Sequence, residues 1–188
     1  MANFPIALLP TQTIVLSLDH DELESLGPDL ANRQCLTQKL QETLNHINRG
    51  AIPEFDNLLL TDICIRTLIE NGLVEAEMAE TLIRFIDLEA TLEELLELIA
   101  QQEPQRRTDW EARVDTILEE TPMSILNAVA HELDRYYGLL QGTGYGAPTK
   151  VLARVAWLER KVGRETAMAR LVAARTLVLE KKQSTPAD

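Results

Sequence analysis

Histidine and cysteine are the residues of this chain that most readily bind metals or act as nucleophiles, and it has three of the first and two of the second. A metal centre in a helical bundle commonly pairs a His with a Glu three residues before it. None of His20, His46 and His131 has an acid there. Cys35 and Cys64 lie in Leu-rich and Ile-rich helical patterns, where Cys is usually a small buried apolar residue. We therefore predict no metal site and no cofactor.

A glycine-rich loop, residues 141–148, precedes a helical pattern that contains Lys150. Closely spaced backbone N–H groups at the start of a helix can bind phosphate. However, the spacing of Gly142, Gly144 and Gly146 differs from a dinucleotide-binding fingerprint, and the Gly-Lys-Ser/Thr ending of a Walker A loop is missing. The loop is therefore predicted to be a flexible turn between helices, with an anion or ligand contact as the alternative.

Acid–base and nucleophilic catalysis have no recognisable signature in this sequence. Glu93, Glu94 and Glu97 are clustered carboxylates, but such residues on an amphipathic helix normally form its solvated face. Nucleophilic catalysis needs a base within hydrogen-bond reach of Ser, Cys or Thr, and no known motif indicates such a pair. We predict that the protein is not an enzyme.

Charge is divided unevenly along the chain. Residues 1–103 hold nineteen acids and five bases, whereas residues 150–182 hold three acids and nine bases, within a net charge of −12. The helix macrodipole accounts for Lys181 and Lys182 near a C-terminus, but not for Arg154 or Arg164. The basic segment can instead dock on an acidic surface of its own chain, of another copy or of another protein, or it can bind nucleic acid. The acidic remainder repels phosphate within a Debye length of about 8–10 Å, which favours docking on protein.

The predicted partner-binding surface combines bases of this segment with nearby aromatic residues. Arg and Tyr are frequent among the residues that contribute most to binding at interfaces. Neighbouring residues on a helix point about 100° apart, so that one of Tyr136 and Tyr137 can be buried while the other faces a partner. The predicted surface consists of Lys150, Arg154, Lys161, Arg164, Tyr137 and Tyr145.

The elements that position these residues are predicted to be helices. From about Pro28 onward, apolar residues recur at helical spacing, and the pattern breaks at residues such as Gly50, Gly72, Pro104 and Gly163. Thr91 and Thr108 each begin a capping-box pattern. The first predicted helix carries the apolar stripe from Leu36 to Ile47 and ends at Gly50, and the second begins at Pro53 and runs up to the stop at residues 71–72. The others are about 74–87, 91–101, 108–118, 122–141, 148–162 and 164–182.

Residues 13–18 are rich in β-branched side chains, but no second convincing strand follows them. We therefore predict an extended N-terminal arm, residues 1–27, followed by one helical domain, residues 28–183, and a disordered tail, residues 184–188. We also predict a hinge at 103–108 that divides this domain into an acidic half and a basic-ended half. The fold class is all-α, an irregular bundle of seven or eight short helices.

No apolar run reaches the roughly 20 residues that span a bilayer, and the N-terminus lacks a secretory signal, so a cytoplasmic protein is expected. The predicted function is a non-enzymatic helical protein–protein interaction module: an adaptor, assembly factor or regulator whose partner is another protein or a second copy in a homodimer. The alternative is a small nucleic-acid-binding regulator that contacts phosphate through residues 148–182.

Overall fold

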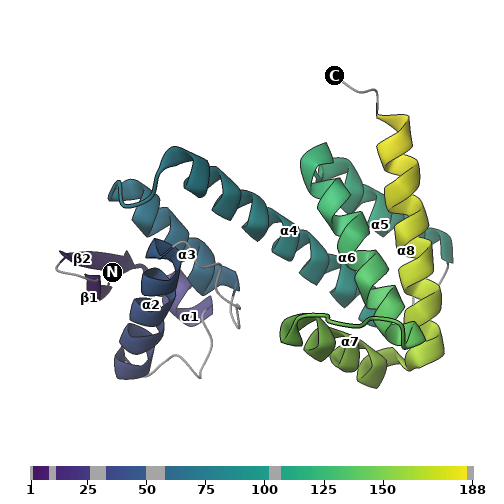
Figure 1. Ribbon diagram of the computed structural model, residues 1–188, viewed down its shortest axis with the longest axis horizontal. Helices are drawn as coiled ribbons and strands as arrows, with labels where there is room; N and C mark the ends of the chain where they lie inside the picture. The colour runs from purple at the N-terminus through teal and green to yellow at the C-terminus, as the bar shows by residue number, and fades with distance from the viewer. Residues whose placement is uncertain (1, 9–11, 26–32, 50–57, 102–106, 186–188) are drawn as a thin grey trace. The chain divides into compact units, whose positions relative to one another are not determined.

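The computed structural model describes residues 2–8, 12–25, 33–49, 58–101 and 107–185, and eight helices and two strands lie in these residues (Figure 1). The predicted all-α class is confirmed, because the only sheet in the described part of the chain is a two-stranded one near the N-terminus. Contacts within the chain divide it into two compact units, Met1–Ile86 and Asp87–Asp188.

The first unit begins with a β-hairpin. Strand β1, Ala2–Leu8, pairs antiparallel with β2, Gln12–Leu18, in a register that places Ile6 opposite Ile14. The side chains alternate, so that Phe4, Ile6, Ile14 and Leu16 are buried while their sequence neighbours are exposed. The prediction that residues 13–18 have no pairing strand is therefore wrong. Because Pro is rare in strands, Pro5 made a strand at residues 2–8 hard to predict from the sequence. A strand nevertheless tolerates Pro at a position where the backbone N–H group would point to the outer edge of the sheet.

Three helices complete this unit with the start of a fourth. Helix α1, His20–Ser25, begins with a reciprocal cap: Asp19 Oδ1 accepts from the Glu22 N–H at 2.8 Å, and the Asp19 N–H donates to Glu22 Oε2 at 3.0 Å. Helix α2 is Arg33–Asn48 and helix α3 is Leu58–Glu70. The predicted stripe on α2 is buried: Leu36, Leu40, Leu44 and Ile47. The predicted helix start at Pro53 lies outside the described residues.

Helix α4, Ala76–Ala100, is one continuous helix of 25 residues where the sequence predicted two. Thr91 does not cap a new helix, because its Oγ1 donates to the Asp87 carbonyl at 2.8 Å inside the helix. No Gly or Pro interrupts residues 87–91, so nothing breaks the helical hydrogen bonds there. The boundary between the two compact units falls inside α4, at residues 86 and 87. The hinge at 103–108 and the single domain at 28–183 stay predictions, and residues 102–106 lie outside the described part of the chain.

The second unit contains the end of α4 and four further helices. These are α5, Arg107–Glu120; α6, Met123–Gln141; α7, Thr149–Val162; and α8, Arg164–Ser184. Helix α8 packs along α6 and also contacts α5 and α7. Gly163 has φ 80° and separates α7 from α8, as the sequence predicted.

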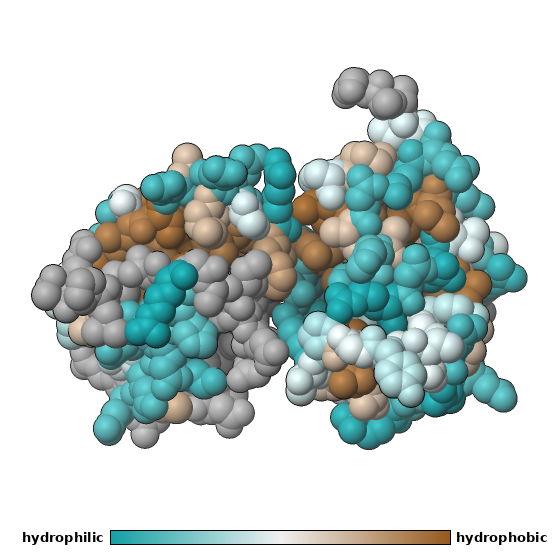
Figure 2. All heavy atoms as spheres, in the orientation of Figure 1, coloured by the Kyte–Doolittle hydropathy of each residue, from teal (hydrophilic) through white to brown (hydrophobic). Residues whose placement is uncertain are grey.

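Each unit has its own hydrophobic core. The core of the first unit combines hairpin residues such as Ile6 and Leu18 with residues of α2, α3 and α4 as far as Leu82. The core of the second unit starts at Leu92 and includes Trp110 and Tyr136. Figure 2 shows a band of hydrophobic atoms where α3 and α4 run in the first unit, and the exposed Ile69 and Ile83 belong to these helices. Within the described residues, no helix combines the length and apolar character needed to cross a membrane.

Candidate functional site

Glu89 on α4 is a buried carboxylate in the second unit, with 8% of its surface exposed. Its Oε2 atom accepts from Arg154 Nη2 at 2.7 Å and also from Lys150 Nζ. Lys150 and Arg154 are four residues apart on α7, so their side chains leave the same face of the helix. Both side chains are less than one-fifth exposed. Two bases of the basic segment therefore dock on an acid of their own chain.

Arg154 connects this ion-pair cluster to the core. Its Nη1 lies 3.5 Å from the Tyr136 hydroxyl, and its Nη2 lies 3.7 Å from Glu93 Oε1. Burial by itself lowers the pKa of Arg154, but the hydrogen bond to Tyr136 and the charge of Glu89 outweigh it, so the pKa is raised. Arg154 therefore stays charged, and its charge balances Glu89 inside the second unit.

Burial raises the pKa of Tyr136, although the neighbouring Arg154 opposes the shift. Above pH about 10 the unfolded chain loses the phenolic proton while the folded chain keeps it, so the free energy of unfolding falls as the pH rises through this range and is unaffected below it. We expect Tyr136→Phe to lose less stability than the wild type between pH about 8 and about 10.5. Urea unfolding followed by tryptophan fluorescence measures this. Tyr145→Phe, at a fully exposed site, is the control, and an equal loss in wild type and Tyr136→Phe would contradict the assignment.

Other bases of residues 150–182 also have partners within the second unit. Arg175 contacts Asp134 and lies over the Tyr137 ring, 5.2 Å from its centroid. Lys181 Nζ lies 3.2 Å from Glu119 Oε1. Arg170 donates to the carbonyls of Ile99 and Gln101 at the C-terminal end of α4, where a cation is favourable to the helix dipole. Lys150, Arg154, Arg170, Arg175 and Lys181 therefore each contact a carboxylate or a carbonyl of another helix in the second unit.

The structure separates the six predicted partner-binding residues into two groups. Lys150 and Arg154 turn toward Glu89, and Tyr137 is half-buried, with its hydroxyl accepting from Gln141 Nε2 at 2.7 Å. Lys161, Arg164 and Tyr145 are exposed. Arg164 lies 3.2 Å from Glu159. Partner binding by these residues remains a prediction, and the exposed group is the one available to a partner.

The glycine-rich loop leads from the end of α6 to the start of α7 (Figure 1) and is held by several hydrogen bonds. The N–H groups of Gly142 and Thr143 donate to the carbonyls of Leu139 and Gly138 at 3.0 and 2.8 Å, and Gly142 has φ 82°. Thr143 Oγ1 also donates to the Gly138 carbonyl. A Cβ atom on Gly144 would lie 2.2 Å from Leu139 Cδ2 and 3.0 Å from Leu139 Cα, so the loop packs closely on α6 at this point.

Tyr145 lies at this loop with its side chain fully exposed, at 101% of the reference area. The Tyr145 N–H donates to the Thr143 carbonyl at 3.0 Å. A shallow pocket of about 290 Å³ adjoins it and is lined by the loop and by His131, Asp134 and Arg135 of α6. Exposure of a whole aromatic ring beside a pocket is the feature that the sequence could not show, because it depends on how the loop folds back on α6.

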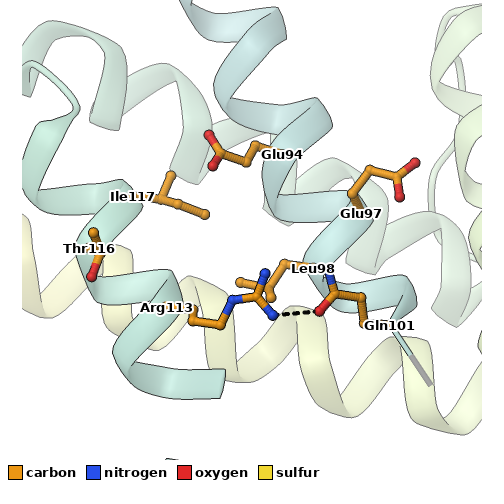
Figure 3. Close-up of a pocket in the computed structure, with 7 residues that line it drawn as sticks. All are labelled: Glu94, Glu97, Leu98, Gln101, Arg113, Thr116 and Ile117. Carbon is orange, nitrogen blue, oxygen red and sulfur yellow. Dashed lines mark hydrogen bonds between the residues drawn. The ribbon is translucent and has the colours of Figure 1, made fainter. Parts of the chain in front are cut away.

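A second pocket of about 280 Å³ lies between α4 and α5. Figure 3 shows Glu94 and Glu97 on α4, with their carboxylates pointing away from each other, and Arg113 of α5 turned toward Gln101. Arg113 Nη1 donates to Gln101 Oε1 at 2.7 Å. The two carboxylates do not converge on one point, so this pocket has the character of a solvated helix surface.

Within the described residues, no group of three or more His, Cys, Asp and Glu side chains is arranged to hold a metal ion. Cys64 is buried, as predicted, but the prediction for Cys35 is wrong because it is exposed. Cys35 precedes the buried Leu36 on α2, and neighbouring helical positions point about 100° apart. Burial raises the pKa of the Cys64 thiol far above its ordinary value.

Comparisons of this chain with protein-family models, with curated proteins and with solved structures found no match.

Proposed function

We propose that this protein is a non-enzymatic, cytoplasmic protein–protein interaction module that binds its partner through the loop at residues 142–147 and the adjoining face of α6. The observation that carries the proposal is the fully exposed Tyr145 ring beside a pocket lined by His131, Asp134 and Arg135. Such a module acts as an adaptor, assembly factor or regulator.

The loop geometry supports binding because it lowers the entropy cost of association. Hydrogen bonds from Gly142 and Thr143 to α6, together with the close packing of Gly144 on Leu139, hold the loop backbone in place. A Tyr side chain has few rotatable bonds, and its ring offers a large apolar surface with a polar tip. Binding of a partner over Tyr145 therefore costs little conformational entropy.

The surroundings of Tyr145 have the composition of an interface rim. His131 and Asp134 are more than half exposed at their side chains, and Arg135 is one-third exposed and paired with Glu132 at 2.6 Å. Polar and charged groups around one aromatic anchor favour specificity and exclude water from the anchor once a partner is bound. We infer that the partner presents an apolar cavity to Tyr145 and polar groups to α6.

In this proposal the bases of α7 and α8 do not act together as the one partner-binding surface that the sequence predicted. Lys150 and Arg154 stabilise the second unit by pairing with Glu89. The exposed Lys161, and Arg164 in an exposed pair with Glu159, can still steer an acidic partner. The alternative of phosphate binding through residues 148–182 has less support, because many of its cations already have carboxylate or carbonyl partners.

The test is the affinity of the partner for a Tyr145→Ala variant. A partner is first identified by capture with the full chain and then purified. We expect Tyr145→Ala to raise its Kd about 30-fold, which corresponds to about 2 kcal/mol for an aromatic anchor. Isothermal titration calorimetry measures this.

Leu152→Ala is the matched control, since Leu152 is a large apolar residue of α7 that is 49% exposed. We expect Leu152→Ala to leave the Kd within about twofold of the wild type. A partner that binds Tyr145→Ala as tightly as the wild type would show that the loop is not the binding surface.

A further inference from the structure

We propose that two copies of this chain associate through the outer edge of strand β2, so that two hairpins form one four-stranded antiparallel sheet around a two-fold axis. This surface belongs to the first unit, whereas the Tyr145 loop belongs to the second unit.

The register of the hairpin identifies the backbone groups that face outward from β2. Val15 lies opposite Pro5, which has no N–H, so this pair occupies a non-hydrogen-bonded position of the ladder. Positions alternate along an antiparallel pair, and the N–H and C=O groups of Thr13, Val15 and Ser17 therefore point away from β1. The sheet has only these two strands in the described part of the chain, and no backbone partner is seen there for these three residues.

The edge of β2 lacks the features that normally prevent strands from pairing. Edge strands are commonly protected by Lys, Pro, bulges or short length. Strand β1 has Pro5, but β2 spans seven residues, Gln12–Leu18, without any charged residue or Pro. Val15 is 57% exposed on its outer face. This edge is therefore a ready template for another strand.

A second copy of β2 fits this edge because the strand is self-complementary. A two-fold axis at Val15 places Val15 opposite the second copy's Val15, and Thr13 opposite the second copy's Ser17. All the outward N–H and C=O groups of these residues then form hydrogen bonds across the axis. Thr beside Ser is a favourable cross-strand pair on the exposed face. On the buried face, Ile14 lies opposite the second copy's Leu16, which extends the apolar side of both hairpins.

The charge of the first unit determines how this association responds to salt. Residues 1–86 hold thirteen acids and five bases, so two copies repel each other at long range. Strand β2 itself brings no like charges together. We therefore expect association to strengthen as salt rises, whereas docking of a basic segment on an acidic surface, or binding of a basic extended peptide, would weaken.

The experiment measures the mass of the full chain by multi-angle light scattering between about 1 and 100 µM. We expect the wild type to shift from 21.1 kDa toward twice that mass as concentration rises, and more so in high salt. Val15→Lys places two cations opposite each other and is expected to weaken association at least about tenfold. Ala7→Lys is the matched control, because it adds the same charge to the same exposed face but on β1, and it should associate like the wild type.

A mixture of Val15→Lys and Val15→Glu tests the register. Each variant alone has like charges at the two-fold axis, while the mixed pair has opposite charges, so native mass spectrometry should show a mixed dimer in preference to either homodimer. Circular dichroism confirms that the variants are folded. A wild type that stays at 21.1 kDa over the whole concentration range, or a Val15→Lys variant that dimerises as well as Ala7→Lys, would overturn the proposal.

Discussion

Glu89→Ala is expected to lower the free energy of unfolding of the second unit by about 3–5 kcal/mol. The substitution removes the carboxylate that both Lys150 and Arg154 contact, and both of those side chains are less than one-fifth exposed. Two cations would then remain in a partly dry environment without their shared counter-charge. Losing a buried counter-charge costs more than the pair contributes net, because both cations keep the cost of leaving water.

Tryptophan fluorescence during urea unfolding isolates this effect. The chain has two Trp residues, Trp110 and Trp157, and both lie in the second unit. Glu93→Ala is the matched control: Glu93 is on the same helix and 3.7 Å from Arg154, but its side chain is 56% exposed. We expect the control to change stability by about 0.5 kcal/mol or less.

A triple variant separates the pairing from the packing. Replacing Glu89, Lys150 and Arg154 together by Met removes the charges but keeps apolar volume, and it should recover most of the lost stability. If Glu89→Ala is no less stable than Glu93→Ala, the cluster does not stabilise the second unit.

Cys64 is expected to react with an aromatic disulfide reagent at least about 1000-fold more slowly than Cys35 in the native protein at pH about 8. Cys35 is exposed, whereas Cys64 is buried in the core of the first unit with a raised pKa, so it presents almost no thiolate. Stopped-flow measurements on Cys35→Ala and Cys64→Ala give the two rates separately. Equal rates in high urea are the control, and native rates within about tenfold of each other would contradict the buried position of Cys64.

Cys64 and the tryptophans report on different units, because the thiol lies before residue 86 and both indoles lie after residue 87. We expect Glu89→Ala to shift the fluorescence transition without changing the reaction rate of Cys64. Each unit has its own core, so loss of the second need not open the first.

Most of the correct predictions about the fold depend on patterns among residues that are close together in the sequence. The stripe from Leu36 to Ile47 on α2 and the break at Gly163 follow from helical periodicity and from the conformational freedom of glycine. Predictions from local patterns were wrong where the same pattern fits two different structures. The capping-box pattern at Thr91 is the same whether the threonine begins a helix or donates to a carbonyl within one, and only the unbroken α4 distinguishes the two.

The sequence by itself determined the helical class and the uneven charge, because periodicity and composition depend only on the order of residues. The tertiary structure alone decided that Glu89 takes two bases from α7, that Tyr145 stands fully exposed, and that residues 2–8 pair with residues 12–18. These facts depend on contacts between distant segments, and Glu89 and Lys150 are 61 residues apart. Charge and hydrophobicity indicate that a residue needs a partner, but which partner it contacts is decided by packing.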